Sequence, residues 1–254
     1  MELVPTIGLG FCPPKGGGQA EQWMRVVREQ DATLLCMSNV HKHGWSAYWP
    51  KGSGILLDLA TTGAIAAGTA DWVRAAMTHV QREFVPSVNR VLFADAKDKA
   101  ESAELIGLPG GTLFLAEIIG GNLRLEWIGA GTATLIRDGR VIARTKPHTL
   151  YEQAVELGAT ADILANYPTV IARTICEEHE HAPETWTLQM PLQANDCLVV
   201  VEGGPCRIID DKTLCELAAH HDTPTATAQA IAHATQSSEQ FCFAAVAVVR
   251  WTAA

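Results

Sequence analysis

The sequence contains no run of basic residues, no long hydrophobic segment and no basic N-terminal leader. Of its 254 residues, 19 are Lys or Arg and 28 are Asp or Glu, which gives a net charge of −9. A surface that binds nucleic acid or an anionic membrane needs clustered positive charge, so neither partner is expected. No segment approaches the roughly 20 uninterrupted apolar residues of a membrane-spanning helix. The first residues, MELVPTIGLGF, lack the features of a signal peptide, so a cytoplasmic location is expected.

The sequence also lacks any C-x-x-C pair. Its seven cysteines are scattered, and most lie in apolar surroundings such as DCLVVV. Zinc and dithiol sites bring cysteines together at short spacings, so neither is indicated and buried thiols are expected. Carboxylates and imidazoles do gather at 177–181, EEHEH. Because adjacent loop ligands without a distant fourth ligand are not a structural zinc pattern, a solvated acidic loop is favoured there.

Apolar residues make up 48% of the chain, enough to bury the core of a single domain spanning residues 1–254. Runs typical of strands are interleaved with pairs of helices, which favours an α+β fold of antiparallel sheets with helices on their outer faces. Residues 1–52 are expected to be largely irregular, with a strand at 32–37 and a helical or extended stretch at 23–28. A long helix is predicted over 55–84, and a second is predicted to begin at Pro86.

The C-terminal half carries further helix signals. The predicted helices are Leu150–Leu157, ended by Gly158, then 161–166, Lys212–His220 and Pro224–Thr235. Thr223 followed by Pro224 fits an N-cap and a first-turn proline. Strands are predicted at 196–202 and 240–251.

The segment 112–145, TLFLAEIIGGNLRLEWIGAGTATLIRDGRVIART, predicts four consecutive strands. Its Gly120-Gly121-Asn122 and Asp138-Gly139-Arg140 sequences suit tight turns, because Gly and Asn tolerate positive φ. Each turn therefore joins neighbouring antiparallel strands. In the second strand, apolar residues alternate with polar ones, which predicts one buried and one wet face. The polar residues are Asn122, Arg124 and Glu126.

Within this segment, IGAGTATLIRDGR resembles the middle of the metal-dependent (type 2C, PPM-type) serine/threonine protein phosphatases. In that family a Gly-Asp-Ser-Arg turn precedes an apolar strand and an Arg-Asp-Gly hairpin. The resemblance continues through KPHTLYEQAVELGATADILANYPTVIARTI and LQANDCLVVVEGGP to the terminal strand. It implies a four-layer α-β-β-α sandwich, two antiparallel β-sheets flanked by helix pairs. The matching residues are His148, Thr149, Leu150, Pro168, Arg173, Leu192, Gln193, Asp196, Leu198 and Gly204.

The resemblance fails at the residues that hold metal. The family places two divalent cations, usually Mg²⁺ or Mn²⁺, among Asp carboxylates, since hard cations need charged oxygen ligands. Here Ala130 stands at one Asp position and Ser38-Asn39 at an Asp-Gly pair. Gly203, with Glu202 beside it, stands at a third position, and Glu239 replaces the Asp of the terminal Asp-Asn pair.

The N-terminal motif of the family, Asn-Glu-Asp, falls on Glu21 and Gln22, or alternatively on Asp31. The former is preferred, because Asp31 leaves too few residues before Ser38. Lys15 is the nearest cation for the family's phosphate-binding arginine. The resemblance therefore implies no metal and no other cofactor, with Glu21, Glu202 and Glu239 as the residues that would hold an ion otherwise.

The segment 41–54 is predicted to be a loop, and its aromatic and imidazole side chains form a candidate binding loop. They would either anchor a ligand or fold down to plug a vacant cleft. The favoured function is a catalytically inactive pseudophosphatase that binds a protein partner or ligand in a regulatory or scaffolding role. The alternatives are a divergent active phosphatase with Mg²⁺ or Mn²⁺ in a rebuilt site, and a structural or assembly protein. The residues of the candidate binding loop are His41, His43, Trp45, Tyr48 and Trp49.

Overall fold

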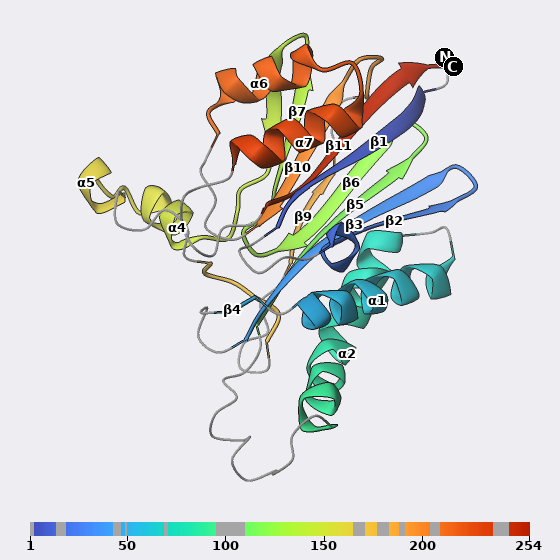
Figure 1. The fold of residues 1–254 in the computed structure, drawn as a ribbon, viewed down its shortest axis with the longest axis vertical. Helices are drawn as coiled ribbons and strands as arrows, with labels where there is room; N and C mark the ends of the chain where they lie inside the picture. Colours follow the sequence, from blue (N-terminus) through green and yellow to red (C-terminus); the bar gives the residue numbers. More distant parts are fainter. Residues whose placement is uncertain are drawn as a thin grey trace.

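Two antiparallel sheets lie face to face in the computed structural model, with helices on both outer surfaces (Figure 1). The structure describes residues 3–13, 19–42, 47–48, 50–68, 71–94, 110–164, 171–176, 183–187, 191–203, 209–235 and 244–254. Sheet A has the order β1 (Leu3–Cys12), β11 (Ala244–Ala253), β10 (Cys197–Gly203), β7 (Thr132–Arg137) and β8 (Arg140–Arg144). Sheet B has the order β2 (Met24–Glu29), β3 (Ala32–Lys42), β5 (Gly110–Ile119), β6 (Asn122–Ile128) and β9 (Glu184–Thr187), and β4 (Ala47–Tyr48) pairs with β3.

The helices complete a four-layer arrangement and confirm the predicted fold class. Sheet B is covered by α1 (Pro50–Ala67) and α2 (Trp72–Ala94), and sheet A by α6 (Asp211–His220) and α7 (Pro224–Ala234) (Figure 1). Three apolar clusters fill the spaces between the four layers. The short elements are η1 (Ala20–Gln22), α4 (Leu150–Glu156) and α5 (Ala161–Leu164). Among the described residues, no helix is both long enough and apolar enough to cross a membrane.

The N-terminal region is more regular than the sequence predicted, because β1, β2 and β3 occupy most of residues 3–42. The stretch at 23–28, for which the sequence left a helix and an extended strand open, is extended and forms most of β2. The strand β1 escaped prediction because two of its buried positions, which face α7, are Gly8 and Gly10, and glycine gives no strand signal. Their absent side chains let α7 approach: a Cβ on Gly10 would lie 2.2 Å from the carbonyl carbon of Ala228.

The segment 112–145 forms four strands, but they do not form one meander. The first turn joins β5 to β6 in sheet B, and the second joins β7 to β8 in sheet A. Between the two hairpins, Gly129-Ala130-Gly131 carries the chain from one sheet to the other. The hairpin turns were correctly predicted, whereas the change of sheet was not, because it depends on contacts distant in sequence.

Two long helices are present, but the helix predicted over 55–84 is divided between α1 and α2, because the chain breaks between Ala67 and Trp72 and not before Pro86. The first begins at Pro50, within the predicted loop, and ends before Gly68, which has a φ of +71°. The second contains Pro86 rather than beginning there. It continues because Val80, Phe84 and Val88, one helical face, are all fully buried, and this packing overrides the local cost of proline.

The C-terminal helices follow their predicted signals. Thr149 caps α4 by accepting a hydrogen bond from the Glu152 amide, and Thr223 caps α7 in the same way, with Pro224 in the first turn. The capping residue of α6 is Asp210. In this half of the chain the strand β9 was missed: it begins at Glu184, three residues after the segment 177–181 predicted as an acidic loop.

Gly10→Ala tests the packing of α7 on β1. We expect a loss of about 3 kcal/mol in the free energy of unfolding, because the new methyl group would overlap the backbone of α7. Gly121→Ala is the matched control, since no atom lies within 4 Å of the position of its Cβ. That change should stay within about 0.5 kcal/mol, as urea unfolding would show. Equal effects of the two substitutions would contradict the assigned contact.

Candidate functional site

The connection between the sheets is held by His148 through both its backbone and its ring. The His148 amide donates to the Gly129 carbonyl at 2.7 Å, and the Gly129 amide donates to the His148 Nδ1 at 3.1 Å. The neutral ring must therefore carry its proton on Nε2. Gly129 has a φ of +118°, and a Cβ there would lie 2.3 Å from the Thr112 side chain. Only glycine fits this position, directly before Ala130.

A carboxylate lies between the sheets beside this connection. Glu202 on β10 is 1% exposed, and its Oε1 accepts a hydrogen bond from the Thr112 hydroxyl of β5 at 2.7 Å. The Thr112 hydroxyl also lies 3.4 Å from the Asn39 carbonyl oxygen on β3. On the other side, a Cβ at Gly131 would lie only 2.3 Å from the Glu202 Oε2. The carboxylate thus fills the space against the Gly129–Gly131 connection.

The strand register explains why Glu202 rather than Gly203 occupies this space. Glu202 pairs with Ala245, which belongs to the core between the sheets, whereas Gly203 pairs with Ala244, which belongs to the outer core under α6 and α7. Side chains alternate along a strand, so a residue at position 203 would point away from the inter-sheet space. The resemblance in sequence places a metal-ligand position at 203, whereas the inward position is 202.

The side chains of Ser38 and Asn39 point to opposite faces of sheet B, because side chains alternate along a strand. Ser38 faces the helices, where its hydroxyl donates to the Ser53 carbonyl of α1 at 3.0 Å. Asn39 falls on the inner face, with Met37 of the inter-sheet core. Both residues are fully buried. Of this pair, the position that faces the inter-sheet space therefore carries an uncharged amide.

The N-terminal candidates lie at opposite ends of β3. Glu21 and Gln22 belong to η1, and Trp23, which follows them, accepts a hydrogen bond from the Ser38 amide at 2.9 Å. Asp31 directly precedes β3, at the end remote from Ser38. The Glu21 side chain is exposed.

The predicted loop at 41–54 is shortened by regular structure on both sides. His41 belongs to β3 and pairs with Tyr48 of β4, and α1 starts two residues later. The prediction underestimated these elements because strand pairing at this sheet edge is not encoded in local sequence. Several other candidates lie outside the described residues: Lys15, His43, Trp45, Trp49, residues 177–181 and Glu239.

The donor set among the described residues does not suit a pair of divalent cations. Around the connection, the inward side chains that the structure describes supply one carboxylate, Glu202, together with the neutral groups of Asn39 and Thr112. In the part of the chain that the structure describes, no group of three or more His, Cys, Asp or Glu side chains is arranged to hold a metal ion. Two-metal hydrolysis requires several charged ligands to bridge both ions, and these residues do not provide them.

Two residues that match the phosphatase family in sequence, Arg137 and Asp196, make contacts that stabilise the fold. Arg137 makes a bidentate ion pair with the fully buried Asp196, with both nitrogen-to-oxygen distances at 2.7 Å. Asp196 also accepts from the Gln193 amide, and Asn195 adopts a φ of +72°. This pair fastens the β7–β8 hairpin to the turn before β10, and it raises the pKa of Arg137.

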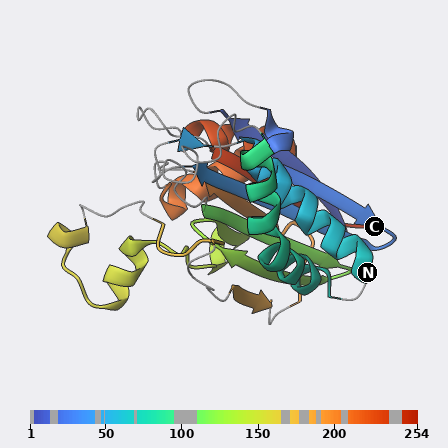
Figure 2. The same cartoon turned by 90° about the horizontal axis from the view of Figure 1, so that it is seen from below.

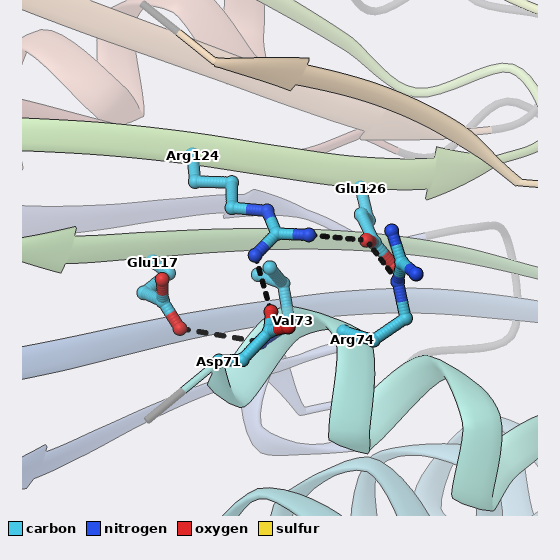
Figure 3. A network of polar contacts seen from close by, with 6 residues as sticks. All are labelled: Asp71, Val73, Arg74, Glu117, Arg124 and Glu126. Carbon is cyan, nitrogen blue, oxygen red and sulfur yellow. Dashed lines mark hydrogen bonds and ion pairs between the residues drawn. The ribbon is translucent and has the colours of Figure 1, made fainter. Parts of the chain in front are cut away.

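A second group of buried acids holds α2 against sheet B (Figure 3). The Glu126 carboxylate is fully buried, and its Oε1 lies 3.1 Å from Arg74 Nε and 3.2 Å from Arg124 Nη2. Arg124 also pairs with Asp71, and Glu117 accepts from the Val73 amide at 3.3 Å. The predicted wet face is exposed at Asn122 and partly exposed at Arg124, but the prediction was wrong at Glu126, which is fully buried where α2 covers the sheet. These contacts hold the start of α2 against β5 and β6 of sheet B.

A cavity of about 360 Å³ lies between α4 and the body of the protein. Its charged lining residues are largely paired with each other: Arg173 lies 3.3 Å from Glu184, and Lys146 lies 3.0 Å from Glu156. The remaining lining residues are Trp127, Arg144, Thr145, Pro147, His148, Thr149, Glu152 and Gln153.

Comparison with known proteins finds the same fold in bacterial phosphatases. No protein-family model matches the sequence, and no curated protein does. Among solved structures, the S. agalactiae serine/threonine phosphatase has a TM-score of 0.69 at 15% identity, over 97% of this chain and 99% of that chain. The Mycobacterium tuberculosis phosphatase PstP/Ppp has a TM-score of 0.68 at 17% identity, over 100% of both chains. PppA of Pseudomonas aeruginosa has a TM-score of 0.68 at 16% identity, over 99% of this chain and 100% of that chain.

These similarities define the class of fold. The protein has the fold of the PPM-type serine/threonine phosphatases, two antiparallel sheets flanked by helices. At this level of identity the comparison establishes architecture, and any activity has to be argued from the residues themselves.

The hydrogen bond between Thr112 and Glu202 can be measured with a double-mutant cycle. Thr112→Val and Glu202→Met each remove one partner, and we expect a coupling of about 1–2 kcal/mol, since the bond joins two sheets in a dry core. Urea unfolding of the four proteins gives the value. The control cycle combines Thr112→Val with Glu216→Gln on the exposed face of α6 and should be additive. Additivity in the first cycle would refute the contact.

Glu117 should make stability depend on pH. Burial raises its pKa above the usual 4.5, although the Val73 and Trp72 amides oppose the shift. The folded protein then holds the proton more tightly than the unfolded chain does. Stability is therefore highest below the unfolded pKa and falls as the pH rises through the raised folded pKa.

Glu117→Gln should abolish the pH dependence that comes from this carboxyl group. As the pH rises through the same window, the variant should therefore become more stable relative to the unsubstituted protein. Urea unfolding at a series of pH values gives both curves. Glu83→Gln is the control, because the hydrogen bond from Arg82 lowers the pKa of Glu83 and any effect should have the opposite sign. Parallel curves for the protein and its Glu117→Gln variant would contradict the assignment.

Proposed function

We propose that the protein is a catalytically inactive pseudophosphatase that acts by binding a protein partner. The observation that supports this most strongly is the composition of the inter-sheet space beside Ala130. One buried carboxylate, Glu202, fills it and is bound to a threonine hydroxyl. His148 holds the connection between the sheets, and the pair Arg137–Asp196 stabilises the fold at the other end of β7 and β10.

The proposal contrasts with one of the structural neighbours. The catalytic domain of PstP was solved in complex with two manganese ions, and it has a TM-score of 0.69 with this chain. By the sequence resemblance, a comparable pair of ions here would need carboxylates around positions 38, 130 and 203. The inward residues at the first and last of these places are Asn39 and Glu202, and position 130 is an alanine. Because an amide and a methyl group cannot replace bridging carboxylates, hydrolysis by that route is not supported.

A divergent active phosphatase is the second candidate. It would use Glu21, Glu202 and Glu239 to hold Mg²⁺ or Mn²⁺. The contact between Glu202 and Thr112 counts against it, because the carboxylate would have to leave a buried hydrogen bond. A purely structural role for the fold is the third candidate, and no contact in the described residues favours it.

Mn²⁺ loading followed by a phosphopeptide hydrolysis assay separates these functions. We expect no stoichiometric binding of two ions by calorimetry and no turnover above the metal-free blank. Ala130→Asp should not restore turnover, since a single carboxylate leaves the other positions unchanged.

Two ions bound with phosphopeptide turnover would overturn the proposal. In that event Glu239→Gln should abolish turnover and Glu216→Gln, on the exposed face of α6, should not. Turnover insensitive to Glu239→Gln would exclude the rebuilt site as well.

A further inference from the structure

One edge of sheet A is formed by β1, a strand of ten residues that carries no charged side chain. Its sequence is LVPTIGLGFC, and among the described strands it pairs only with β11. The start of β1 lies beside the end of β11, so both termini are found at one end of the molecule in both views (Figures 1 and 2). Proteins usually protect a long edge strand with charged side chains, with proline or with a covering segment.

The backbone groups that point away from β11 belong to alternate residues of β1. At Phe11 they are bound by the Gln229 side chain of α7, which accepts from the Phe11 amide at 3.3 Å and donates to the Phe11 carbonyl at 3.2 Å. The register with β11 is uninterrupted, so Ile7 and Leu9 direct their N–H and C=O groups to the same side as Phe11. In the part of the chain that the structure describes, no group bonds to these outward groups of Ile7 and Leu9. The row ends at Pro5, which has no N–H.

The contact with Gln229 shows which chemistry this edge binds. A carboxamide supplies one donor and one acceptor, and it bonds both backbone groups of Phe11 as one residue of a neighbouring antiparallel strand would. The same pair of groups recurs at Leu9 and again at Ile7. The edge therefore offers two further places that match the backbone of an extended peptide.

The side chains of β1 restrict the sequence of such a peptide. Ile7 and Leu9 are partly buried and pack against the core between the sheets. Residues opposite them on an added strand point to the same face, so apolar side chains there extend this core. The residue between them points to the face of Gly8, where α7 lies so close that a Cβ on Gly8 would overlap Thr225. An apolar, small, apolar sequence fits these three places.

The position of α7 argues against a second copy of this chain as the occupant. A Cβ on Gly8 or Gly10 would overlap the backbone of α7, so this helix lies directly over β1. If two copies paired through β1, their strands would be about 4.8 Å apart, and their α7 helices would lie about equally close. Packed helices need about 8–10 Å. A segment without a helix above it avoids this overlap.

We infer that β1 is a docking site for an extended segment of a partner protein, which adds to sheet A as an antiparallel strand through Ile7 and Leu9. The segment has an apolar, small, apolar sequence and no charge at these three positions, because a charged group there would lose its hydration. The inference rests on the proposed binding function and adds to it the place of binding and the chemistry of the partner segment.

A peptide of defined sequence tests this inference on the full chain. The probe is Thr-Val-Ala-Val-Thr with an acetylated N-terminus and an amidated C-terminus, in excess, followed by NMR. We expect it to slow hydrogen exchange at the Ile7 and Leu9 amides and to leave Gly8 unchanged, since the Gly8 amide already faces β11.

Backbone methylation of the peptide supplies a matched control. N-methylation of both valines removes the two N–H groups that face β1 and should weaken binding by about tenfold or more. N-methylation of the alanine, whose N–H points away from β1, should change the affinity by less than about twofold. Side-chain attraction alone would not distinguish these two peptides.

Two protein variants test the same contacts from the other side. Leu9→Pro removes an outward N–H and should weaken binding by about tenfold, while an edge strand tolerates proline at such a position. The thermal midpoint checks its folding, and Ile65→Ser on the exposed face of α1 is the control. Gln229→Ala frees Phe11, so a peptide lengthened by one N-terminal valine should bind about threefold more tightly to this variant. If Leu9→Pro does not fold, the methylated peptides decide the question.

Three outcomes would overturn the inference. They are unchanged exchange at Ile7 and Leu9, equal loss of affinity on methylation of the alanine or of the valines, and self-association of the protein that protects the same two amides. The last would make a second copy the occupant. Turnover with two bound Mn²⁺ ions would refute the proposed function without affecting peptide binding, and absence of peptide binding would refute the docking site alone.

Discussion

The structure depends on the passage of the chain between its two sheets at Gly129–Gly131. Each sheet receives one hairpin from the same segment, so both sheets are connected through these three residues. Two hydrogen bonds to His148 fix the entry, the positive φ and close contact at Gly129 require glycine, and Glu202 fills the space against Gly131. Any side chain introduced here must therefore compete with groups that already hold the sandwich together.

In the residues that resemble the phosphatase family, stabilising the fold and ligating a metal ion are carried by different positions. Arg137, Asp196 and His148 stabilise turns and the connection between sheets, and they can do so without a metal. The methyl group of Ala130 can form neither a hydrogen bond nor an ion pair, and the resemblance in sequence places a metal ligand at this position. A fold of this kind can therefore lose its metal ligands and keep its architecture, because different residues carry the two properties.

Local chemistry accounts for what the sequence predicted correctly. The turns at Gly120–Asn122 and Asp138–Arg140 and the N-caps Thr149 and Thr223 depend on residues close in sequence. The missed features depend on distant contacts. Gly8 and Gly10 form a strand because α7 packs on them, and Glu126 is buried because α2 covers it.

The same distinction applies to the candidate site. The resemblance identified positions 38, 130 and 203, but only the pairing of β10 with β11 shows that residue 202 faces inward. The contacts of α4 were equally inaccessible, since the sequence gives a helix without saying which face meets the body. The 3.6-residue period predicts the helix and leaves its partner undetermined.

The central claim is that the fold persists without a two-metal centre, and an anomalous difference map from crystals soaked in Mn²⁺ tests it most directly. The account predicts no anomalous peak between the sheets beside Ala130 and Glu202, with the Glu202 carboxylate still hydrogen-bonded to Thr112. Two peaks there, with Glu202 and Glu239 turned toward them as ligands, would contradict it.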